Sequence, residues 1–154
     1  MLPALLIGFT AGARAMTPFT IVSDAAAQGT LPPGSGAPAW LGHPLTALGA
    51  KLLAGGELVG DKQPDAPDRT VAAGMTARVL TGALAGAALT ARRQRLGGMV
   101  AGGLAAAGSA YLTLALRKRA MARFGQASTG IVEDVLVLTL ARRALSAACR
   151  RAGA

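Results

Sequence analysis

Charged side chains lie inside long apolar stretches of this 154-residue chain. On insertion scales, a charge at the centre of a bilayer costs about 2.5–3.5 kcal/mol. Such charges usually pair with one another or face a polar cavity, where they can hold an ion or pass a proton. Two basic and three acidic residues are in this position: Arg14, Arg78, Glu57, Glu133 and Asp134.

The signs of these five charges nearly balance, which predicts ion pairs between helices. We expect Arg78 to meet Glu57 across the loop that joins their helices. Arg14 is expected to meet Glu133 or Asp134. Adjacent residues point about 100° apart on a helix, so these two carboxylates cannot both face one partner.

The segment 55–70, which reads GGELVGDKQPDAPDRT, concentrates charge at the end of an apolar helix. Glu57 and Asp61 are four residues apart and share a helix face. Two carboxylates in line can bind a cation or relay a proton. Alternatively, Lys62 and Arg69, in the proline-containing loop that follows, neutralise them.

All of these charges also admit a purely structural interpretation. If they lie within a turn of a membrane surface, their side chains reach water and lose most of the penalty. They would then only fix helix ends and helix packing. The sequence leaves both interpretations open.

The composition identifies the elements that must hold these charges. Hydrophobic residues make up 52% of the chain, charged residues 15% and aromatic residues 3%, with a mean hydropathy of +0.44. The apolar content is mostly Ala, Leu, Val and Gly, and small residues let membrane helices approach closely. We therefore predict one integral membrane domain over residues 1–154, with the lipid bilayer as its surroundings.

The formal net charge of +9 does not indicate nucleic-acid binding, because the basic clusters follow apolar segments, as membrane anchors do. The single cysteine excludes an internal disulfide and a multi-thiolate metal site, and the single histidine excludes a histidine cluster. We find no catalytic set and predict no metal and no cofactor.

The predicted fold is all-α, a polytopic transmembrane bundle of about five membrane segments. Residues 1–27 are expected to form a first segment that breaks at Thr17-Pro18, because proline removes a backbone donor. The N-terminal apolar run also resembles a signal peptide, but no basic residues precede it. The remaining predicted segments are 45–60, 72–91, 96–116 and 128–140.

The basic clusters fall almost equally on the two sides of such a bundle and leave its orientation open. Either residues 117–124 form an amphipathic helix at the interface, or the protein inserts both ways and forms antiparallel dimers. Glycine pairs at i, i+4 predict close helix packing within or between subunits, and we expect a homo-oligomer. These pairs are Gly8/Gly12, Gly56/Gly60, Gly82/Gly86 and Gly98/Gly102.

A Gly-rich segment followed by an acidic helix occurs twice, as residues 1–27 then 45–61 and again as 96–116 then 128–140. Glu57 and Glu133 take comparable places in the two parts. Many transporters are built from such repeats. The pattern allows an internal repeat without residue-level identity to support it.

Four segments together resemble a bacterial membrane family, domain of unknown function 4126: GFTAGARAMTP (8–18), GELVGDKQPDAPDRT (56–70), MTARVLTGALAGAAL (75–89) and IVEDVLVL (131–138). The most specific part is the pattern E-x-x-x-D-K-x-P-x-x-P-x-R, which starts at Glu57 and ends at Arg69. The resemblance covers most of the chain and implies that these charges act together in the cytoplasmic membrane. It brings no assigned activity. The chain departs from the family mainly in its Gly/Pro-rich loop at 29–38 and its basic C-terminus.

The functional expectation is a transporter or channel-like protein for a small solute or ion. The alternative is an accessory subunit whose buried charges select its helix partners.

Overall fold

The computed structural model describes residues 1–60 and 72–153, and within them the chain is all-helical. Six α-helices and two 3₁₀ turns account for the regular structure of this part. They are α1 (Leu2–Ala13), α2 (Met16–Ala27), η1 (Ala39–Gly42), α3 (Pro44–Gly60), α4 (Ala72–Ala88), η2 (Arg92–Gln94), α5 (Arg95–Phe124) and α6 (Gln126–Ala152).

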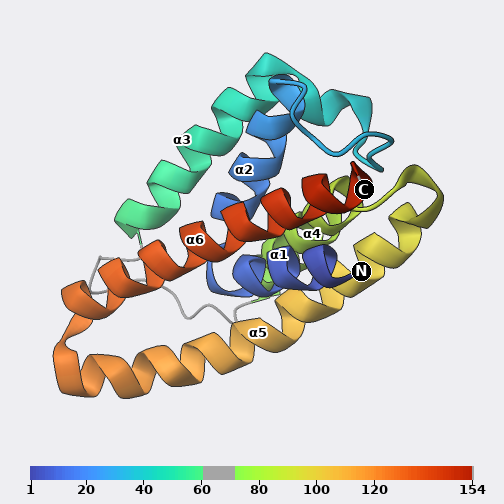
Figure 1. The fold of residues 1–154 in the computed structure, drawn as a ribbon. Coiled ribbons are helices and arrows are strands. Elements are labelled where there is room, and N and C mark those ends of the chain that lie inside the picture. The colour runs from blue at the N-terminus through green and yellow to red at the C-terminus, as the bar shows by residue number, and fades with distance from the viewer. Residues whose placement is uncertain (61–71, 154) are drawn as a thin grey trace.

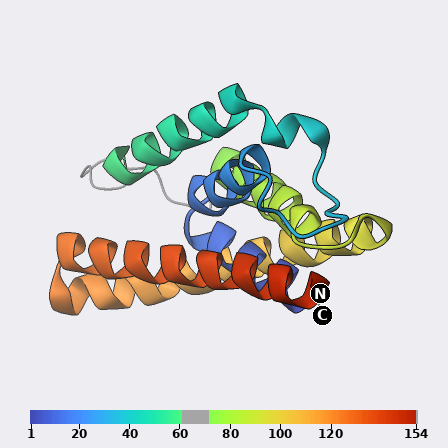
Figure 2. The same cartoon turned by 45° about the horizontal axis from the view of Figure 1, so that its top comes forward.

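The helices α1, α4 and α5 form the centre of the molecule. α1 packs against α4, α5 and α6, and α4 packs along α5. Figure 1 shows α5 and α6 as a long antiparallel hairpin with α1 beside it, and Figure 2 shows α3 on the opposite side, beyond α2. Residues from both termini line one shared hollow, so the two ends of the chain lie together.

Glycines make the central contacts possible. A Cβ added at Gly8 would overlap the backbone of Gly102, and a Cβ added at Gly86 would overlap the carbonyl oxygen of Gly98. Three of the four predicted glycine pairs, in α1, α4 and α5, therefore serve close packing within one chain. Gly56, from the fourth pair, has open space around its Cβ position among the described residues.

The buried apolar residues are mostly alanines, whereas many of the large apolar side chains are exposed. On α3, Leu45 is 71% exposed and Leu52 is 70% exposed; on α5, Leu104 is 69% exposed. The chain therefore has a core of mostly small residues under an exterior rich in large apolar side chains.

The interruption predicted near Arg14 and Pro18 is real, but the break does not lie at Thr17-Pro18. α1 ends at Ala13 and α2 begins at Met16, so the break lies at Arg14 and Ala15. Pro18 falls in the first turn of α2, where backbone N–H groups have no partner within the helix, so its missing donor costs nothing there.

The later helices are longer than the sequence indicated. α5 runs on without interruption to Phe124, so residues 117–124 are its last turns and not a separate interfacial helix. Arg, Lys, Ala and Met in those turns are strong helix formers. The helix stops at Gly125, whose φ of +81° suits glycine. α6 continues past the predicted end at 140 to Ala152.

One segment of the described chain, residues Arg92–Phe124 containing α5, is long and apolar enough by itself to cross a membrane. α3 and α4 have 17 residues each, and α1 and α2 have 12 each. In the proposed repeat, the first half begins with two short helices, α1 and α2, separated by a break. The second half begins with one continuous helix, α5.

Candidate functional site at the break between α1 and α2

The backbone leaves its helical path at Arg14, which is extended with φ −140° and ψ 109°. Twelve residues give a helix about 18 Å long, too short to cross a hydrocarbon core of about 30 Å. The break lies next to buried parts of α4 and α6, so it creates two helix ends inside the molecule. Unsatisfied backbone groups at such ends need partners.

Glu57, from α3, supplies the partner for the start of α2. The amide N–H of Ala15 donates to its Oε1 at 2.9 Å, and the amide N–H of Met16 donates to its Oε2 at 2.9 Å. Both carboxylate oxygens thus bind the N-terminus of α2. A helix N-terminus carries a partial positive charge, which the carboxylate complements.

Arg78, from α4, supplies the partner for the end of α1. Its Nε donates to the carbonyl oxygen of Gly12 at 3.1 Å, and its Nη1 donates to the carbonyl oxygen of Gly74 at 3.0 Å. A cation at a helix C-terminus complements the partial negative charge there. The Nη2 of Arg78 lies 4.0 Å from Oε1 of Glu57, which confirms the predicted pair at the outer limit of an ion-pair distance.

Arg14 joins the break to α6. Its Nη2 lies 2.7 Å from Oδ1 of Asp134, and its side chain is 1% exposed. This pair was one of the two predicted for Arg14 and is confirmed. A carboxylate from another helix thus pairs with the buried guanidinium of the extended residue.

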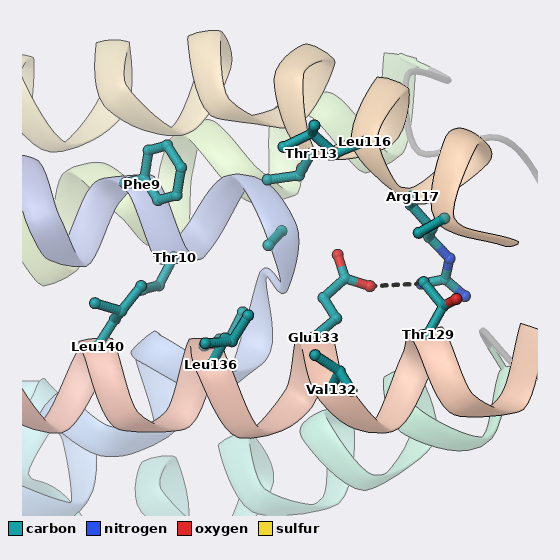
Figure 3. Close-up of a pocket in the computed structure, with 13 residues that line it drawn as sticks. Phe9, Thr10, Thr113, Leu116, Arg117, Thr129, Val132, Glu133, Leu136 and Leu140 are labelled. Atoms are coloured by element: carbon teal, nitrogen blue, oxygen red, sulfur yellow. Dashed lines mark hydrogen bonds and ion pairs between the residues drawn. The ribbon is translucent and has the colours of Figure 1, made fainter. Parts of the chain in front are cut away.

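Glu133, the neighbour of Asp134, points elsewhere, as adjacent helical residues must. It accepts a hydrogen bond at 2.9 Å from Nη1 of Arg117, on α5. Figure 3 shows this ion pair between α5 and α6, at the side of an apolar pocket that also contacts α1. The sequence predicted Glu133 as a site residue but did not predict Arg117.

A signal for Arg117 was present in the sequence. Arg117 and Glu133 lie eight residues before and eight residues after Gly125. In a helical hairpin that turns at this glycine, two such residues reach the same height on facing helices. The capping role of Glu57 had no comparable signal in the sequence.

Asp61, Lys62 and Arg69 lie outside the described residues. The line of carboxylates from Glu57 to Asp61 and the neutralising loop therefore stay predictions. In residues 1–60 and 72–153, no three His, Cys, Asp or Glu side chains gather in a way that could hold a metal ion.

The site thus defines a structural class, an all-helical protein with an interrupted first helix. The end of α1 is held by a charged side chain from α4, and the start of α2 is held by one from α3. The model of the family described as domain of unknown function (DUF4126) matches residues 1–149, so the chain belongs to that family. This confirms the resemblance seen in the sequence motifs. No curated protein and no solved structure matches the chain.

Proposed function

We propose that this chain is a multi-pass protein of the bacterial cytoplasmic membrane that moves a small solute or ion past the break between α1 and α2. The transported species would travel along the charged groups that converge there. Homo-oligomer formation stays part of the proposal.

The distribution of side chains supports the membrane location. Large apolar residues cover the outside of α1, α3, α5 and α6, while the contacts between helices are made by Gly and Ala. Lipid tails solvate exposed leucines well, and small residues allow the close contacts that hold membrane helices together. A soluble protein would expose this surface to water and aggregate.

The interrupted helix is the observation that carries the transport proposal. In many secondary transporters, discontinuous helices place their inner ends at the binding site, near the middle of the membrane. Here the inner ends of α1 and α2 are held by Arg78 and Glu57, and the residue between them pairs with Asp134. Breaking and re-forming these pairs would present donors and acceptors to a passing solute.

The test is a flux assay with purified protein in liposomes, using a trapped pH-sensitive dye under gradients of H⁺, K⁺ and Cl⁻. Glu57→Gln keeps the size of the side chain and removes its charge, so flux should fall at least tenfold while the folded helical signal remains. Lys51→Gln is the matched control, because Lys51 pairs with Asp24 at the surface, away from the break. Equal flux through Glu57→Gln and wild type would contradict the proposal.

The accessory-subunit alternative is favoured by one specific observation. Both carboxylate oxygens of Glu57 are already bonded to backbone amides, which is how a group that only shapes a helix would be used. In that case no ion gradient would produce flux through wild type. Loss of Glu57 would instead lower the recovery of folded protein and of any co-purifying partner.

A further inference from the structure

Two hollows adjoin each other along the second half of α5. The first is a cavity of about 250 Å³ between α5 and α6, which contacts one end of α1 (Figure 3). Its walls are almost wholly apolar and come mainly from large side chains, among them Phe9, Leu116, Val132, Leu136, Val137 and Leu140.

The charged groups of this cavity lie at one end. The Arg117–Glu133 ion pair is on the side of the α5–α6 turn, while Phe9 and Leu140 lie at the opposite side (Figure 3). A molecule that fills the cavity would therefore have its apolar part toward α1 and its polar part toward the turn.

The second hollow lies further along α5 and is lined by two arginines, Arg119 and Arg123, together with Ala122 and Phe124. It shares Leu116 and Ala120 with the first cavity. An apolar cavity thus adjoins, along one helix, an open surface region bordered by two arginines. Arg119 and Arg123 are exposed, and residues 117–124 contain four basic residues and no acidic one.

We propose that these two hollows form one binding site for an anionic phospholipid. An acyl chain occupies the cavity between α5 and α6, and the phosphate lies between Arg119 and Arg123. Guanidinium groups bind phosphate oxygens with paired, charge-assisted hydrogen bonds. Basic clusters that follow a membrane segment attract anionic lipids in the same way.

The site rests on the membrane location proposed above, and it does not depend on transport. Splayed helices with a cavity between them, opening near a surface of exposed leucines and valines, give an acyl chain a route from the bilayer. The two arginines favour an anionic headgroup on the bound lipid. A zwitterionic headgroup carries its own cation beside the phosphate, and that cation would be repelled by the arginines.

The test measures lipid binding to the full-length detergent-solubilised protein by native mass spectrometry. Dioleoyl phosphatidylglycerol and dioleoyl phosphatidylcholine are added in equal amounts, and wild type should retain mainly the anionic lipid. The double variant Arg119→Gln/Arg123→Gln should bind that lipid more than about tenfold more weakly, since each cation near an anionic lipid contributes measurably to affinity. Arg142→Gln/Arg143→Gln is the matched control: both arginines are exposed on α6 and line neither hollow.

A second variant tests the cavity separately. Ala120 lines both hollows, so Ala120→Phe should fill the space and reduce binding of both lipids while leaving the protein folded. Equal retention of the two lipids by wild type would overturn the proposal, as would a preference for the anionic lipid that survives Arg119→Gln/Arg123→Gln. Release of the lipid by millimolar inorganic phosphate alone would show a free-phosphate site and would also overturn it. Lipid selectivity without ion flux would refute the transport proposal and leave this one standing.

Discussion

The break between α1 and α2 and the open hairpin of α5 and α6 use buried charge in different ways. At the break, Glu57 and Arg78 bind backbone groups at two helix ends, next to helices packed through glycine. In the hairpin, Arg117 and Glu133 join side chain to side chain across the edge of an apolar cavity.

This difference shows what each pair does for the molecule. Charges that bind backbone groups satisfy the helix ends at the break, so their removal should cost stability there. The Arg117–Glu133 pair joins two helices without bonding to their backbone, and it lies at the side of the cavity. The same residue types therefore cap helix ends in one region and line the proposed lipid site in the other.

The largest expected effect comes from the glycine contacts beside the break. Gly102→Leu would push a side chain into the backbone of Gly82 and Gly86, so little folded protein should be recovered. Gly108→Leu, on the same helix, has open space and should be tolerated or slightly stabilising. The yield of folded protein and thermal unfolding in detergent measure the effect of each variant. Normal stability of Gly102→Leu would contradict the close packing of α4 on α5.

The next comparison sets Glu57→Ala against Glu133→Ala. Removing Glu57 leaves two helix-end amides and Arg78 without their carboxylate, and should lower the free energy of unfolding by about 3–5 kcal/mol. Removing Glu133 costs one charged hydrogen bond, about 1.5–3 kcal/mol. Unfolding in detergent measures both values. If both variants lost the same free energy of unfolding, the break and the hairpin would not differ in how they use charge.

A double-mutant cycle tests the tie between the break and α6. Arg14→Met and Asp134→Leu should each destabilise the protein, because each leaves a charge of a buried pair behind. The double variant should lose less than the two single losses combined, by about 0.5–3 kcal/mol. Additive losses would mean that the two side chains are not coupled.

The smallest effect is expected at the surface. Lys51 lies 2.6 Å from Asp24, with 53% and 34% of their side chains exposed. Lys51→Gln should change the free energy of unfolding by less than about 1 kcal/mol. If Lys51→Gln lowered the free energy of unfolding as much as Glu57→Ala, the exposed Lys51–Asp24 pair would matter as much as the charges at the break.

The sequence predicted much of this arrangement. Opposite charges in apolar stretches were enough to pair Arg78 with Glu57, and Arg14 with either Glu133 or Asp134, because a buried charge needs a partner. The glycine spacing predicted the close helices. The exact position of the break was not predictable from Pro18, because a proline is tolerated in the first turn of a helix. The position depends instead on Glu57 from α3 and Arg78 from α4. The cavity was equally out of reach, because it depends on the angle between α5 and α6.

The central claim is that each helix end at the break is held by a charge opposite to its own partial charge. The anion Glu57 holds the start of α2 and the cation Arg78 holds the end of α1, and exchanging the two charges tests this most directly. In Glu57→Arg/Arg78→Glu the pair is restored, but a cation would face the N-terminus of α2 and an anion the carbonyl end of α1. Helix ends favour only one sign each, so the exchanged protein should be no more stable than the worse single variant in thermal unfolding. Recovery of wild-type stability by the exchange would contradict the claim.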